Sequence, residues 1–164
     1  MICFWTFAVT WRYMHLEGID MYSLKIVDGD LAMLGDGTIS KVSGADRIRQ
    51  DLSCWILEPL GTDVMYPNFG STLGNDIGAP IVADNLLEIK AEVTRVVNNY
   101  IEYQKKQYED AKLRSTDAVV NAWTPGDMIA KVNGIHVDSV ADTVTVVVKL
   151  TTAAGEGISI EQVL

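Results

Sequence analysis

Glu58 and Asp63 flank the turn at 59–61, and they are the first residues to consider for catalysis. Paired carboxylates can hydrolyse a glycosidic bond when one of them stays protonated at neutral pH. That role needs an acid in an apolar environment, and the sequence around these two residues indicates none. We therefore interpret both as solvated loop acids and predict no catalytic residues and no enzymatic activity. A lysozyme-like glycosidase is the alternative hypothesis.

Metal and redox chemistry have few candidate residues. Cys3 and Cys54 are too few for a disulfide framework or a four-thiolate metal site, and they favour a reducing compartment. His136 lies alone in a strand-like pattern, which is more typical of a structural residue than of a ligand, and His15 is the only other histidine. Residues 28–30, Asp-Gly-Asp, lack the later ligands of a calcium loop and are better interpreted as a hairpin turn. We predict no metal and no cofactor.

The composition indicates one domain with a substantial core. The chain has 164 residues, of which 48% are hydrophobic and 21% charged. Acidic residues outnumber basic ones by 22 to 13, which gives a formal charge of -9. A surface this acidic repels phosphates, so we predict neither nucleic-acid binding nor attachment to an anionic membrane.

Residues 1–20 form an apolar N-terminal segment that differs from the rest of the chain. Its only early base, Arg12, follows the apolar run, whereas a signal peptide has its bases first. The run is also shorter than the roughly 20 apolar residues that span a bilayer. Two interpretations stay open: an arm that packs on a partner, or an extension upstream of a protein that starts near Met21. Residues 21–164 are then a single domain.

Two helices are predicted in the middle of the chain. Ser43 is a plausible N-cap, and Ile48, Leu52, Trp55 and Ile56 repeat on one helical stripe that ends before Pro59. A second helix is expected from Asp84 to about Leu113, and a short one at 117–123. The loop at 60–73 contains Val64, Met65, Tyr66 and Phe69, and we expect so apolar a loop to be packed against the body.

The remaining elements are strands. Short strands joined by tight turns are expected at 22–42. In the C-terminal third, strands are expected at 128–140, at 143–152, where the run is β-branched, and at 158–163. The fold class is therefore α+β: a small mixed or antiparallel sheet with a long helix and a C-terminal β-hairpin.

The stretch at 44–78 resembles the baseplate wedge family of contractile phage tails, also called sheath initiators, with relatives in type VI secretion baseplates. The family pattern is a helix with Ile-x-Gln-x-Leu, then a glycine, then Pro-x-aromatic-Gly. The residues that carry the resemblance here are Ile48, Gln50, Leu52, Gly61, Pro67, Phe69 and Gly70. We expect these residues to be structural, with Gly70 permitting a turn and Phe69 anchoring the loop on the first helix. Residues 123–127, Trp-Thr-Pro-Gly-Asp, stand where many members carry a Glu-Pro-Arg triplet.

The resemblance implies a structural role in a virion tail assembled in the host cytoplasm. The implied partners are the tail sheath protein, baseplate wedge proteins, and tube or hub proteins, in a six-fold baseplate. Sheath growth would be templated by strand addition at a sheet edge. The predicted partner-binding residues are Thr143, Val144, Thr145, Val146, Val147, Val148, Lys149 and Leu150. An adaptor in a non-contractile tail is a further alternative.

Overall fold

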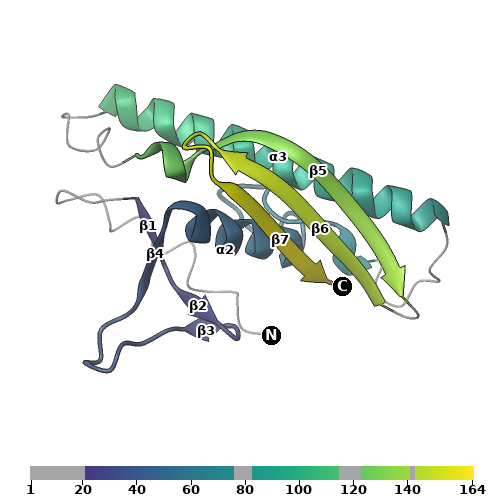
Figure 1. Cartoon of the computed structure of the whole chain (residues 1–164), viewed down its shortest axis with the longest axis horizontal. Coiled ribbons are helices and arrows are strands. Elements are labelled where there is room, and N and C mark those ends of the chain that lie inside the picture. The colour runs from purple at the N-terminus through teal and green to yellow at the C-terminus, as the bar shows by residue number, and fades with distance from the viewer. Residues whose placement is uncertain (1–20, 76–82, 115–122, 141–142) are drawn as a thin grey trace.

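The structure is a computed structural model that describes residues 21–75, 83–114, 123–140 and 143–164 (Figure 1). The predicted N-terminal arm and nearly all of the short helix expected at 117–123 lie outside these residues. The helices are α2 (Gly44–Leu57) and α3 (Ala83–Arg114), with 3-10 turns η1 (Leu73–Asn75) and η2 (Pro125–Asp127). The strands are β1 (Tyr22–Leu24), β2 (Ile26–Val27), β3 (Asp30–Leu31), β4 (Lys41–Ser43), β5 (Ile129–Val140), β6 (Thr143–Thr152) and β7 (Gly157–Val163).

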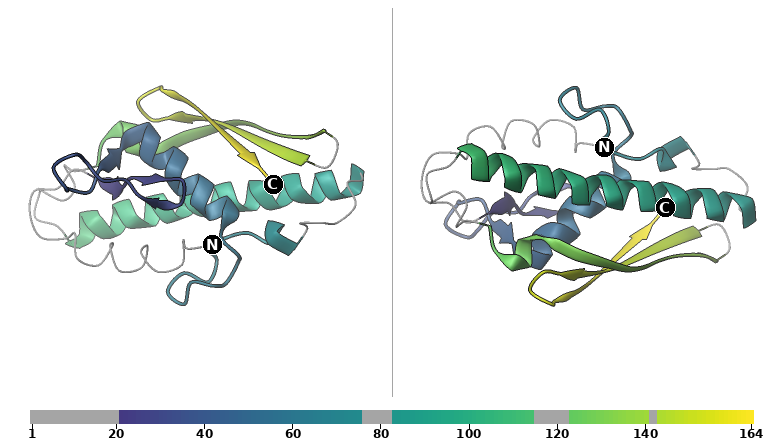
Figure 2. Two further views of the ribbon diagram at one scale, coloured as in Figure 1. Left: turned by 90° about the horizontal axis from the view of Figure 1, so that it is seen from below. Right: turned by 90° about the horizontal axis from the view of Figure 1, so that it is seen from above.

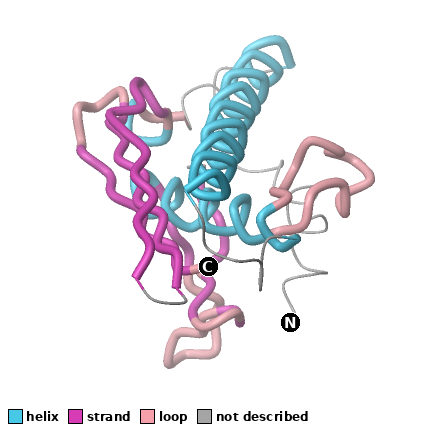
Figure 3. The backbone as a smooth tube through the Cα atoms, turned by 90° about the vertical axis from the view of Figure 1, so that its right-hand side faces the viewer, coloured by secondary structure: helices cyan, strands magenta, loops and turns pink. Residues whose placement is uncertain are grey.

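Within the described residues the strands form three antiparallel sheets, and together with the helices they confirm the predicted α+β class. β1 pairs with β4, β2 pairs with β3, and the C-terminal sheet has the order β5-β6-β7. This sheet lies on one side of the helices, and the loop at 58–72 lies on the other side (Figures 2 and 3). The helices therefore separate the C-terminal sheet from this loop.

The short N-terminal strands follow the predicted turn chemistry. Asp28 and Gly29 both have positive φ, at 53° and 83°, which is the geometry of the tight Asp-Gly hairpin turn between β2 and β3. The side chain of Gln50 on α2 bridges the backbone of this region. Its amide donates to the Leu24 carbonyl and its oxygen accepts from the Ile26 N–H, both at 2.8 Å.

Helix α2 begins and ends where the sequence predicts, but its cap comes from another element. Ser43 is the N-cap residue, yet its hydroxyl makes no capping hydrogen bond. The Asp127 carboxylate accepts the Gly44 N–H instead, at 3.0 Å. The helix ends at Leu57, two residues before Pro59, where the residue preceding proline avoids helical geometry.

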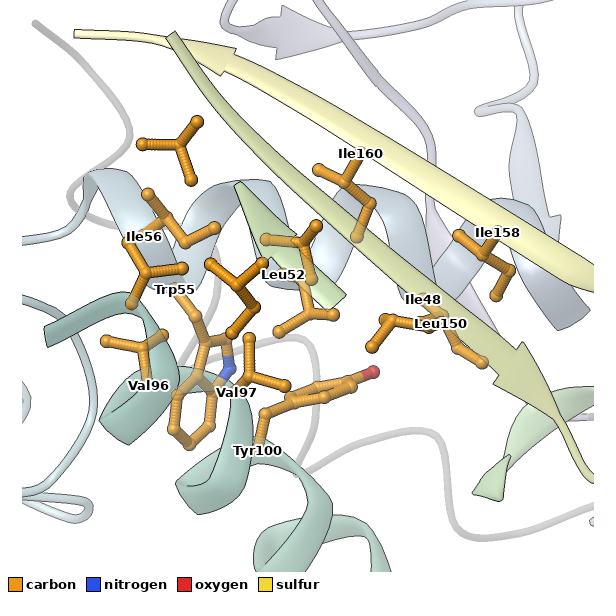
Figure 4. Close-up of a cluster of buried hydrophobic side chains, with 14 of the residues drawn as sticks. Ile48, Leu52, Trp55, Ile56, Val96, Val97, Tyr100, Leu150, Ile158 and Ile160 are labelled. Carbon is orange, nitrogen blue, oxygen red and sulfur yellow. The ribbon is translucent and has the colours of Figure 1, made fainter. Parts of the chain in front are cut away.

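The core is one cluster between the two helices and the inner face of the C-terminal sheet (Figure 4). The predicted stripe on α2 is buried, and α3 covers it with a second apolar stripe. In β6, even-numbered residues from Val144 to Thr152 face inward and odd-numbered residues face outward, as the period of a strand requires. The buried hydrophobic residues that Figure 4 labels are Ile48, Leu52, Trp55, Ile56, Val96, Val97, Tyr100, Leu150, Ile158 and Ile160.

Candidate functional site

The strand predicted to bind a partner lies at the centre of its sheet. β6 pairs with β5 along one side and with β7 along the other. Its backbone groups are therefore used within the chain, and Thr143–Leu150 cannot receive an added strand. This part of the prediction is wrong, because a β-branched run indicates a strand without indicating its place in a sheet. The strands that border the sheet are β5 and β7.

The hydrogen bonds of β7 identify the backbone groups that point away from the sheet. The Leu164 N–H donates to the Val144 carbonyl and the Thr152 N–H to the Glu156 carbonyl, both at 2.9 Å. Hydrogen-bonded pairs alternate along an antiparallel ladder, so the residues at 158, 160 and 162 of β7 bond to β6. The N–H and C=O groups of the residues between them, Ser159, Glu161 and Val163, point outward.

The two border strands differ in regularity. β7 pairs with β6 without a break in register from Gly157 to Val163. β5 has register shifts between Ile129 and Lys131 and between Val132 and Gly134. Such bulges disrupt pairing and are one way in which proteins protect a sheet border from strand addition. β7 therefore offers the better edge for an incoming strand.

The side chains of β7 give this edge two distinct faces. Ile158 and Ile160 are buried against the helices, and β7 packs along α2. Ser159, Glu161 and Val163 lie on the outer face and are exposed. The β7 edge therefore has an apolar face toward α2 and a mostly polar face toward solvent.

Most motif residues of α2 and the following loop make packing or backbone contacts. Ile48 and Leu52 are fully buried, and Gln50 bridges the N-terminal strands. Phe69 is half-buried and packs edge-on against Trp55, with ring centroids 4.8 Å apart. Pro67 is exposed.

The two motif glycines meet different constraints. Gly61 has φ +79° with open space around it, whereas Gly70 has φ +93° and approaches another segment of backbone. A Cβ at Gly70 would lie 2.6 Å from the Glu58 carbonyl oxygen. Gly70 thus allows the returning chain to pair with the end of α2, where the Ser71 N–H donates to the Glu58 carbonyl at 2.7 Å.

Helix α3 fixes the base of this loop by an ion pair. The Arg95 guanidinium donates to the Gly70 carbonyl at 2.9 Å and to the Glu92 carboxylate at 2.7 Å. The same carboxylate accepts the Thr72 N–H at 2.7 Å. Hydrogen bonding from Arg95, followed by that from Thr72, outweighs partial burial and lowers the pKa of Glu92 to about 2.

The far end of the loop is exposed, contrary to the expectation that the whole loop packs. Val64 and Met65 are 93% and 71% exposed. Tyr66 packs edge-on against Tyr103 of α3, with centroids 5.2 Å apart. Tyr66 and Phe69 thus add ring contacts with α3 and α2 to the hydrogen bonds that hold the base of the loop.

Glu58 and Asp63, the acids considered for glycoside hydrolysis, both accept hydrogen bonds within this loop. The Asp63 carboxylate accepts the N–H groups of Met65 and Tyr66, at 2.7 and 3.1 Å. The Glu58 carboxylate accepts the hydroxyl of Thr62 at 2.9 Å. Both acids therefore stabilise turns of the loop, and their contacts do not favour a catalytic role.

A buried polar cluster, which sequence reasoning missed, joins α2 to α3 and β1. Asp51 is buried and accepts hydrogen bonds from the Tyr100 hydroxyl at 2.9 Å and from the Ser23 hydroxyl at 3.4 Å. Burial raises the pKa of Asp51, and the nearby Arg47 opposes that shift in part. The available signal was the spacing of Arg47 and Asp51, which are four residues apart beside the apolar stripe of α2.

Arg47 extends this cluster toward the turn η2. It is 2% exposed and forms an ion pair with Asp127, with 3.7 Å between the guanidinium and the carboxylate. The Asp127 carbonyl accepts Gln104 of α3 at 3.0 Å, and the Gln104 side-chain oxygen accepts the Ile129 N–H at 3.2 Å. Among the described residues, the Arg47 Nε has no hydrogen-bond partner. The cluster thus holds both helices to the start of the C-terminal sheet.

The remaining candidates carry no metal or membrane site within the described residues. No group of three or more His, Cys, Asp or Glu side chains there is placed to hold a metal ion. His136 is exposed on β5 and Cys54 is half-buried on α2, whereas His15 and Cys3 lie outside the described residues. None of the helices in the described ranges has the length and apolar character needed to cross a bilayer.

Comparisons of the chain with protein families, with curated proteins and with solved structures find no match. The resemblance of residues 44–78 to the baseplate wedge family therefore enters below as a hypothesis.

Proposed function

We propose that this chain is a non-enzymatic component of a contractile tail baseplate, where it joins the wedge to the first sheath ring and templates sheath polymerisation. The single observation that carries the proposal is the edge of β7. Ser159, Glu161 and Val163 present outward backbone groups on a regular strand that is fixed to a rigid core. Such an edge recruits an extended segment by completing its ladder of hydrogen bonds.

The way the edge is supported suits a template. β7 is anchored by Ile158 and Ile160 in the core, so the template itself loses little conformational entropy when a strand adds to its edge. A contact between an edge of one chain and a strand of the next is head-to-tail, and such contacts continue into helical polymers when they do not close. The tail sheath protein is the proposed strand donor, within a six-fold virion baseplate.

A proline scan of β7 tests this proposal. Glu161→Pro removes an outward N–H and should leave the fold intact, because edge strands tolerate proline where the N–H faces solvent. Glu161→Ala keeps the N–H and is the matched control. Ile160→Pro removes an N–H that bonds to β6 and should unfold the sheet, as should proline at Val146 or Val148 in the central strand.

The measurement is seeding of purified sheath protein by the full chain, followed by light scattering and electron microscopy. We expect Glu161→Pro to slow seeding at least about ten-fold while its circular dichroism stays native, because backbone pairing supplies the affinity. Glu161→Ala should seed like the wild type. Full seeding by a folded Glu161→Pro variant would contradict the proposal.

The alternatives predict different results. A glycosidase would lower the turbidity of a cell-wall suspension, and Glu58→Gln or Asp63→Asn would abolish that activity. An adaptor of a non-contractile tail would come from a genome without a sheath gene next to its own. Neither alternative gains support from a specific contact among the described residues.

A further inference from the structure

The hairpin arm, residues 26–40, exposes more apolar surface than its fold needs. Val27, Met33, Leu34 and Ile39 are 47%, 64%, 52% and 39% exposed. The arm extends away from α3 and is separate from the β7 edge (Figures 1 and 3). Large apolar side chains that gather on one projecting element are typical of an interaction surface.

These side chains occupy both faces of the arm. Met33 and Ile39 are directly opposite each other, flanked by hydrogen bonds from Leu34 to Thr38 at 2.7 Å and from Ser40 to Ala32 at 2.8 Å. They form a non-hydrogen-bonded pair, in which side chains on one face lie closest together. Leu34 follows Met33 and therefore points to the other face. A partner that covers both faces must receive the arm in a groove.

The charge of the arm identifies the chemistry of that groove. Residues 26–40 contain Asp28, Asp30 and Asp36 and no lysine or arginine. A second copy of this chain, with its formal charge of -9, would be repelled by the arm. Attraction instead requires a partner with a basic rim, and such complementarity selects partners and speeds their encounter.

Hydrogen bonds within the arm and to α2 stabilise its turns before binding. Asp36 accepts the N–H and hydroxyl of Thr38, at 2.9 and 2.7 Å, and these bonds lower the pKa of Asp36. Gln50 ties the start of the arm to α2 through Ile26. A preorganised element loses little entropy on binding, so even a short arm can contribute usefully to affinity.

We propose that the hairpin arm is a docking element that inserts into an apolar groove rimmed by lysine or arginine on a partner protein. This inference goes beyond the proposed function and is independent of it, because it concerns different residues and a different mode of recognition. The arm would be recognised through side chains, whereas the β7 edge would be recognised through its backbone.

A defined peptide serves as the probe. A fluorescent amphipathic peptide of leucine and lysine presents an apolar stripe with a basic rim, and a peptide of leucine and glutamate with the same pattern is its control. Binding to the full chain is measured by fluorescence anisotropy at low and high salt. Amide chemical shifts in ¹⁵N spectra locate the site. We expect the lysine peptide alone to bind, more weakly in high salt, and to shift residues 26–40.

Three double variants distinguish specific binding at the arm from nonspecific binding of the peptide elsewhere on the chain. Met33→Ser with Ile39→Thr removes the apolar pair, and Asp28→Asn with Asp30→Asn removes two charges while keeping a residue that tolerates positive φ. Val64→Ser with Met65→Ser is the matched control on the other exposed apolar segment. We expect each arm variant to weaken binding at least about ten-fold and the control to change it less than about two-fold.

Several outcomes would overturn the proposal. They are no binding to the wild-type chain, equal binding of the glutamate peptide, shifts that map outside the arm, or folded arm variants that bind normally. If the apolar double variant does not fold by circular dichroism, the Asp28→Asn and Asp30→Asn pair decides the question, because both side chains are exposed. Full seeding by a folded Glu161→Pro variant, which would contradict the proposed function, would leave these results unchanged.

Discussion

The Tyr100 hydroxyl on α3 donates a 2.9 Å hydrogen bond to the carboxylate of Asp51 on α2, and both side chains are buried. The two helices are thus joined through a carboxylate that has lost its hydration. Burial is also the main reason that the pKa of Tyr100 is raised well above its usual value. A buried acid of this kind fixes the register of two helices at a cost in stability when it is ionised.

Asp51→Asn should be as stable as the wild type at pH 7, or more stable by about 1 kcal/mol, because it removes a buried charge. The pKa of Asp51 is raised in the folded state, so its favourable contribution is complete below pH 3.8 and is lost as the pH rises through the folded pKa. The difference between Asn variant and wild type should therefore shrink as the pH falls. Urea unfolding of both proteins between pH 4 and pH 8 measures this difference in unfolding free energy. A difference that stays constant with pH would contradict the raised pKa of Asp51.

Glu92→Gln should have the opposite pH dependence. The folded pKa of Glu92 is lowered to about 2, so its contribution is present above the unfolded value of 4.5 and is lost as the pH falls toward 2. Because the ion pair with Arg95 is partly exposed, we expect a loss of about 1–2 kcal/mol at pH 7. Gln keeps an oxygen for the Thr72 N–H, so Glu92→Ala should cost more. Equal stability of Gln variant and wild type at pH 7 would show that the ion pair contributes nothing.

Gly70→Ala and Gly61→Ala form a matched pair in the motif loop. Both residues have positive φ, so alanine should cost about 1 kcal/mol at either site from backbone conformation. Only at Gly70 does the new Cβ meet backbone, at 2.6 Å from the Glu58 oxygen. We therefore expect Gly70→Ala to cost roughly 1–3 kcal/mol more than Gly61→Ala in thermal or urea unfolding. Similar costs would mean that the close approach relaxes easily.

Phe69→Ala tests the anchoring of the same loop. Phe69 packs on Trp55 but is only half-buried. We therefore expect Phe69→Ala to lower the free energy of unfolding by about 2 kcal/mol, less than the roughly 3–5 kcal/mol lost when a fully buried Phe is truncated. Val64→Ala, at a site 93% exposed, should change stability by less than about 0.5 kcal/mol. Amide hydrogen exchange across 60–72 should increase only in the Phe69 variant. A Phe69 variant that is as protected as the wild type would show that the bonds to Arg95 and Glu92 hold the loop alone.

Local patterns in the sequence predicted most elements, because their causes are local. The apolar stripe of α2, the long helix at 83–114 and the β-branched run at 143–152 each express a period or propensity of the chain itself. The sequence also predicted the Asp28-Gly29 turn, because Asp-Gly is one of the few residue pairs that readily adopt the positive φ values of this turn. The contact of Phe69 with α2 was expected because large apolar side chains in a loop favour packing against the body.

Tertiary structure decided what depends on partners far away in the chain. A β-branched sequence is equally typical of a central strand and of a border strand. Only the pairing of β6 with both β5 and β7 showed that the candidate edge is β7, at Glu161 and its neighbours. The burial of Asp51 depended likewise on Tyr100, which is 49 residues away. The hydrophobicity of Val64 and Met33 likewise did not predict that both side chains are exposed to solvent. Burial is a property of the assembled surface, and apolar residues reserved for a partner have the same chemistry as those in the core.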